Sequence, residues 1–155
     1  MAITSAICNS FKQEILVEGH NFTGSTDQFK LALYDSDNAV LSKSTTQWTV
    51  ATDPTADPTS TREVSTTGTG YTSGGNDLTS TTPVVNGDSA CCLFATTTWG
   101  STASFTARGC LIYNETASNK SVCSINFGGD KTVTSGTFTI EFPAQTASNA
   151  IIEIT

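Results

Sequence analysis

Residues 86–142 constrain the fold of this chain most, because they alternate short β-prone stretches with polar turns. Four strands are expected in this run, near residues 90–96, 103–113, 121–127 and 136–142, and Gly, Asn, Asp or Ser marks each junction. In SVCSINF (121–127) and GTFTIEF (136–142), apolar residues alternate with polar ones. That alternation is typical of antiparallel strands with one buried face. The run therefore predicts an antiparallel β-protein.

The rest of the chain extends this pattern to an all-β protein, an antiparallel β-sandwich of about eight or nine strands. Further strands are expected at 29–34, 46–50, 78–85 and 150–155. Asn86-Gly87 predicts a tight hairpin, and prolines exclude a central strand from the expected loop at 51–62. The 155 residues show no internal repeat and suffice for one core. A single domain over residues 1–155 is therefore expected.

One short N-terminal amphipathic helix is expected ahead of the sheets, at about residues 5–18. Ile7, Phe11 and Ile15 recur at helical spacing, and Gly19 supplies a stop. A lone amphipathic helix before a β-domain covers either an open end of the sandwich or a neighbouring subunit. Ile7, Phe11 and Ile15 are therefore candidate interface residues.

Five cysteines are present, and two interpretations of them stay open. Four lie in expected strands and one lies on the apolar face of the expected helix: Cys91, Cys92, Cys110, Cys123 and Cys8. They are either small buried thiols in a protein made under reducing conditions, or partners in disulfides formed after release into an oxidising environment. In the second case, the odd number leaves at least one thiol unpaired or available to another chain.

Residue types that serve enzymes and metal sites are sparse. His20 is the only histidine, no nucleophile motif accompanies it, and it is expected to be exposed or to cap the helix. Cys91 and Cys92 are adjacent and no C-x-x-C occurs, which disfavours a zinc site. The D-S-D-N sequence at 35–38 is interpreted as a turn and not a calcium loop. We expect no catalytic residue, no metal and no cofactor, and hence no enzyme.

The charge pattern argues against nucleic-acid and membrane partners. The net charge is −7, and the seven basic residues are dispersed, whereas nucleic-acid binding requires clustered Lys and Arg. No segment reaches the roughly 20 apolar residues that span a bilayer, and the N-terminus lacks a secretion-signal pattern. Synthesis in a cytoplasm is expected. The Trp and Tyr side chains are expected to seal the sandwich core or a subunit contact and not to form a sugar-binding platform.

Several segments resemble a family of small virion proteins of tailed bacteriophages. In chain order these are CNSFKQEIL, FKLALY, EVSTTGTGYTSGG, ASFTARGCLIYN, and INFGGDKTVTSGTFTIEFP with the closing AIIEI. Together they cover essentially the whole chain. The cysteines depart from the family pattern, since small apolar residues such as Ala would be expected at several of these strand positions.

The resemblance implies a bacteriophage virion structural protein, made in the host bacterial cytoplasm and located in the virion. Its most specific form is a capsid decoration (cement) protein that bridges shell subunits. The implied partners are its own copies, in a homo-oligomer expected to be a trimer, and other virion proteins such as the major capsid protein. The alternatives are a tail or neck component (tube, baseplate or fibre-associated) and a host-surface adhesin module that would use residues 51–62 and 66–76.

Overall fold

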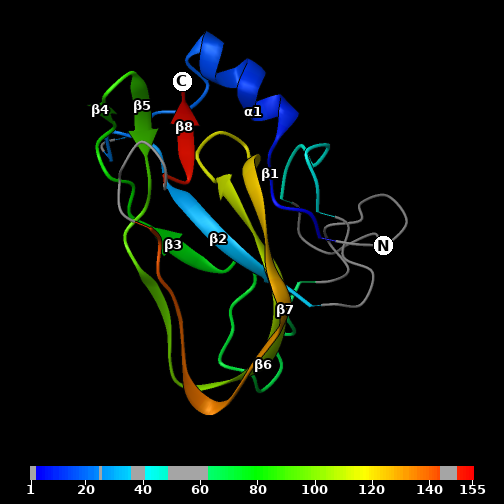
Figure 1. Ribbon diagram of the computed structural model, residues 1–155. Helices are drawn as coiled ribbons and strands as arrows, with labels where there is room; N and C mark the ends of the chain where they lie inside the picture. The colour runs from blue at the N-terminus through cyan, green and yellow to red at the C-terminus, as the bar shows by residue number, and fades with distance from the viewer. Residues whose placement is uncertain (1–2, 25, 36–40, 49–62, 144–149) are drawn as a thin grey trace.

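The computed structural model describes residues 3–24, 26–35, 41–48, 63–143 and 150–155. Within them, eight strands form two antiparallel sheets, which confirms the expected all-β sandwich-like fold (Figure 1). The strands are β1 (Ala6–Ile7), β2 (Phe29–Tyr34), β3 (Asn76–Leu78), β4 (Val84–Asn86), β5 (Ser89–Cys92), β6 (Thr97–Asn114), β7 (Lys120–Ile140) and β8 (Ile152–Ile154). The five-stranded sheet has the order β1-β7-β6-β2-β3, and the three-stranded sheet has the order β4-β5-β8.

β6 and β7 form one long antiparallel ribbon. Their pairing runs from Asn114↔Lys120 to Thr97↔Ile140, with register shifts along its length. Figure 1 shows the ribbon bending back at the lower end of the molecule. The prediction of separate strands at 121–127 and 136–142 was wrong, because the residues between them continue to pair with β6. β-Bulges allow such a bend without ending a strand.

The expected hairpin at Asn86-Gly87 is confirmed. Asn86 pairs with Ser89, so Gly87 and Asp88 form a two-residue loop between β4 and β5. Gly87 has a φ of 63°, a conformation that glycine adopts without steric cost. The single strand expected at 78–85 is divided between β3 and β4.

β2 and the end of β6 are buried on both faces. Leu31, Leu33 and Ile112 face the main core between the sheets. Tyr34 and Tyr113 belong to a second cluster on the opposite face, which Leu41 and Trp48 help to cover. This explains why LALY and CLIY are continuous apolar runs without alternation.

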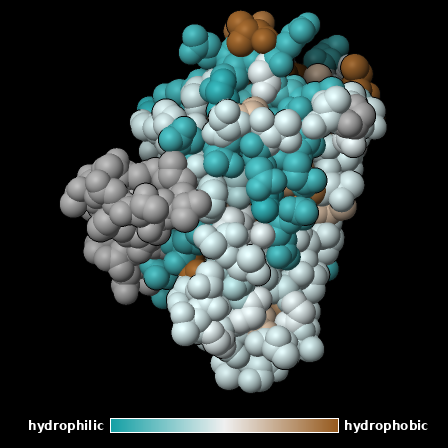
Figure 2. Space-filling model, turned by 180° about the vertical axis from the view of Figure 1, so that it is seen from behind, coloured by the Kyte–Doolittle hydropathy of each residue, from teal (hydrophilic) through white to brown (hydrophobic). Residues whose placement is uncertain are grey.

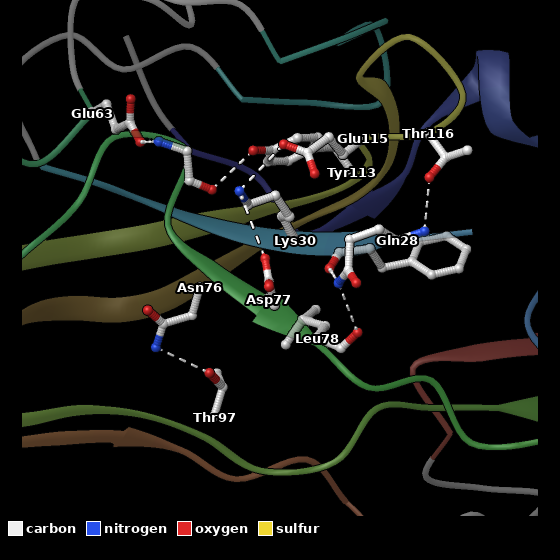
Figure 3. A network of polar contacts seen from close by, with 12 residues as sticks. Gln28, Lys30, Glu63, Asn76, Asp77, Leu78, Thr97, Tyr113, Glu115 and Thr116 are labelled. Carbon is white, nitrogen blue, oxygen red and sulfur yellow. Dashed lines mark hydrogen bonds and ion pairs between the residues drawn. The ribbon is translucent and has the colours of Figure 1, made fainter. Parts of the chain in front are cut away.

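Polar contacts hold β3 and the preceding loop against β2 (Figure 3). Lys30 Nζ lies 3.6 Å from Asp77 and 3.3 Å from Glu115. The Glu63 carboxylate accepts a 2.6 Å hydrogen bond from the N–H of Gly74, and the hydroxyl of Tyr113 donates to the Gly74 carbonyl over 2.9 Å. These bonds fix the turn that leads into β3.

The helix is shorter than predicted. α1 comprises Asn9–Glu14 and continues as a 3-10 turn over Ile15–Val17. The expected start near residue 5 was wrong, because β1 pairs with β7 through Ala6↔Ser124 and Ile7↔Cys123. The turn ends at Glu18, whose φ of 59° is left-handed.

Some predictions lie wholly or partly outside the described residues. Of the strand expected at 46–50, the described part includes one bridge, from Gln47 to Lys120. Residues 49–50, the loop at 51–62 and most of the D-S-D-N turn lie outside.

Candidate interaction surface

One end of the molecule exposes large apolar side chains. We call this the apolar end and define it as Leu16, Val17, Val84, Val85 and Ile154. Leu16, Val17, Val85 and Ile154 are 83%, 71%, 80% and 53% exposed. Figure 1 shows α1, β4 and β8 together at this end, and Figure 2 shows brown atoms there above a largely polar surface. Single exposed apolar residues are ordinary, but a group of them is typical of an interaction site.

Local structure explains these exposures. The six-residue helix buries Phe11, after which the tight 3-10 turn leaves Leu16 and Val17 in solvent. β4 lies at the edge of its sheet, and all three of its residues are exposed. Sequence reasoning missed the valines of β4, although two adjacent valines in a short strand must point to opposite faces.

An apolar groove with a volume of about 370 Å³ lies between α1 and β8. Its lining includes all three candidate interface residues, Ile7, Phe11 and Ile15, together with Leu16, Ile152 and Ile154. Phe11 is buried and belongs to the main core, whereas Ile7 and Ile15 are half-buried against that core. The structure therefore brings the three predicted residues together, and their contact with a partner stays a prediction.

The groove continues along one side of the sandwich. A second hollow is lined by Ile7, Ile125 and Ile151, and a third by Phe127, Phe138 and Ile140. All six side chains pack against the core but are only partly buried. The described residues thus leave the side of the sandwich beside β8 incompletely covered.

His20 is buried, so the expectation of an exposed or helix-capping histidine was wrong. Its Nε2 lies 2.8 Å from Oε2 of Glu14, and its Nδ1 lies 3.1 Å from the side-chain nitrogen of Asn114. Asn114 also donates to Asp27 over 2.6 Å and accepts from the N–H of Ala117 over 3.1 Å, which fixes its amide orientation. His20 Nδ1 must therefore accept and Nε2 must donate.

This arrangement occupies both ring nitrogens of His20 with protein partners. A hollow beside it is lined by His20, Asn21 and Asp27 among others. Burial raises the pKa of Asp27, but hydrogen bonds from the N–H of Asn21 and the amide of Asn114 lower it overall. A general base needs a ring nitrogen that can reach substrate, and neither nitrogen of His20 is available for that. Its geometry fits a structural role.

None of the five cysteines forms a disulfide, and all five are buried. Cys8, Cys92, Cys110 and Cys123 belong to the main core. Burial raises the pKa of Cys92 to about 11 and that of Cys123 to about 12, and it raises that of Cys110 well above its usual range. These thiols are protonated at neutral pH and are poor nucleophiles.

The structure also bears on the aromatic side chains, on metal ligands and on membrane-spanning helices. Trp48, Trp99, Tyr34, Tyr71 and Tyr113 are all buried, as expected. Among the described residues, no three His, Cys, Asp or Glu side chains gather as metal ligands. Within those same ranges, every helix is too short or too polar to cross a membrane.

Comparisons with known proteins do not assign a family: no family model matches the chain, and neither curated proteins nor solved structures show a match.

Proposed function

We propose that this chain is a structural protein of a bacteriophage particle, and that it acts as a decoration protein on the capsid. The observation that carries the proposal is the apolar end with its adjoining groove. Among the described residues, neither the thiols nor His20 offers a competing site, because the thiols are buried and both nitrogens of His20 are engaged. Such a molecule is suited to work through docking.

The size of the apolar end bears on how the protein would bind. Full burial of a Val, Leu or Ile side chain contributes about 2 kcal/mol, so the exposed fractions of Leu16, Val17, Val85 and Ile154 represent about 6 kcal/mol. Association costs at least about 4 kcal/mol in lost translational and rotational freedom. One apolar end is therefore a weak anchor by itself.

Several linked copies would make that weak anchor effective. In a symmetric homo-oligomer, such as the expected trimer, the second and third contacts become intramolecular and gain from a high effective concentration. Because the bound state exists only on the assembled shell, its binding free energy stabilises the shell against dissociation. A decoration protein must stabilise the assembled shell in this way.

Quantitative peptide mass spectrometry of purified phage, with heads and tails separated, tests the proposal. We expect this chain in the head fraction, in a fixed ratio to the major capsid protein. Recovery from the tail fraction alone would favour the tail or neck alternative. Absence from both fractions would overturn a virion role altogether.

A further inference from the structure

We infer that an extended segment of another virion protein pairs with the outer edge of β8 and fills the groove between β8 and α1. The segment would add a fourth strand to the order β4-β5-β8. This inference rests on the proposed function and names the kind of partner that the surface would bind.

The first argument is the unpaired edge of β8. Ile152, Glu153 and Ile154 pair with β5 on one side only, and β8 ends the three-stranded sheet among the described residues. An edge strand presents main-chain N–H and C=O groups that can accept another strand. Figure 1 shows α1 passing over this end of the sheet.

The second argument is the apolar floor next to that edge. Phe11 and Ile152 are buried at the base of the groove, and Leu16 and Ile154 are exposed at its rim. Below them, Ile7 and Ile125 are half-buried where the groove continues along the sandwich. A strand with alternating apolar side chains would cover these residues while its main chain pairs with β8.

The third argument is charge, which favours a segment of a different protein over a second copy of this chain as the occupant of the groove. Glu153, the middle residue of β8, lines the groove. Lys12 is the basic residue in the lining. Two copies that paired β8 with β8 about its middle residue would place the two Glu153 carboxylates on adjacent strands, within chains of net charge −7. A neutral or basic segment from a different protein avoids that repulsion.

β4 is a poorer place for an added strand. It forms the opposite edge of the same sheet, but Val84, Val85 and Asn86 are all exposed, so no core surface lies beneath them. β8 differs because its buried Ile152 continues into the main core. Among the described residues, β8 combines an edge that has no second strand partner with an apolar floor beside it.

Amide hydrogen exchange measured by mass spectrometry on purified phage and on the isolated chain tests the inference. We expect those amides of residues 152–154 that point away from β5 to exchange at least about tenfold more slowly in the particle, since they gain a strand partner. Treatment of the particle with a bifunctional amine-reactive crosslinker should join Lys12 to a lysine of another virion protein, identified from the linked peptides. Ile154→Lys should lower incorporation into particles, whereas Thr132→Lys, which places the same charge on an exposed strand position of the other sheet, should not.

The outcomes separate the possibilities. Unchanged exchange at β8 in particles that contain the chain would overturn the inference and leave the proposed function standing. Links from Lys12 to another copy of this chain, or β8 protection that rises with concentration in the isolated chain, would replace the partner with a second copy and overturn it. Absence of the chain from particles would overturn the proposed function and the inference together.

Discussion

Asn114→Asp would test whether the His20 network is structural. The substitution keeps the shape of the side chain but replaces the donating nitrogen with an acceptor oxygen. Two donated bonds would be lost, to His20 Nδ1 over 3.1 Å and to Asp27 over 2.6 Å. Loss of a buried hydrogen bond costs about 1–3 kcal/mol, with bonds to charged groups at the upper end. We expect the free energy of unfolding to fall by about 3 kcal/mol at pH 7, a large share of the usual 5–15 kcal/mol.

The sign of the pH dependence makes this prediction specific. The new carboxyl group would be buried beside Asp27, and both effects raise its folded-state pKa above the unfolded value of about 3.9. A raised pKa makes the penalty small below about pH 4 and larger toward pH 7. Urea unfolding followed by the fluorescence of the buried Trp48 and Trp99 measures the difference at each pH.

Asn9→Asp is the matched control, because it makes the same chemical change at an exposed position in the first turn of α1. It should change the free energy of unfolding by less than about 0.5 kcal/mol. A loss of less than 1 kcal/mol for Asn114→Asp, or a loss independent of pH, would refute the structural account of His20.

Three further predictions follow from local geometry. Gly75→Ala should destabilise the protein by more than about 3 kcal/mol in urea unfolding, because the added Cβ would lie 1.7 Å from the carbonyl oxygen of Leu31. Gly68→Ala has a similar positive φ but open space, so it should cost only about 1 kcal/mol, and equal losses would contradict the argument. The pKa of Asp27 is lowered in the folded state, so its contribution to the free energy of unfolding is present above about pH 4 and is lost as the pH falls through the folded-state value. The melting temperatures of Asp27→Asn and of the unmodified protein should therefore differ most at neutral pH and converge in acid. The Cys110 thiol should react with a thiol reagent at pH 7 only after unfolding in concentrated urea, and rapid modification of the native chain would contradict its burial.

Strand content was predictable where the residue pattern is local. FKLALY forms β2 over the expected residues, and the Asn86-Gly87 hairpin is present. The alternation of Phe138 and Ile140 with Thr139 matches their burial in β7. These elements depend on side-chain spacing within a few residues, which the sequence shows directly.

Features that depend on long-range pairing were not predictable in the same way. The predicted start of the helix was wrong because Ala6 and Ile7 pair with residues more than a hundred positions away in the sequence. The prediction of separate strands within β7 was wrong because β-bulges allow its pairing with β6 to continue through a segment rich in turn-forming residues. In both cases tertiary hydrogen bonding overrides local preference.

The candidate site was predictable in part. Ile7, Phe11 and Ile15 were chosen from helical spacing, and all three line the groove, although Ile7 lies in β1. The other wall comes from β8 at the far end of the chain, which no local pattern connects to the helix. The partners of His20 are equally remote, since Asn114 lies on β6.

A reconstruction of the phage particle by electron cryomicroscopy tests the central claim most directly. We predict density for this chain on the head, with the apolar end turned toward neighbouring virion proteins and an additional strand beside β8. Density that places Leu16, Val17 and Ile154 in solvent, with nothing against the groove, would contradict the account.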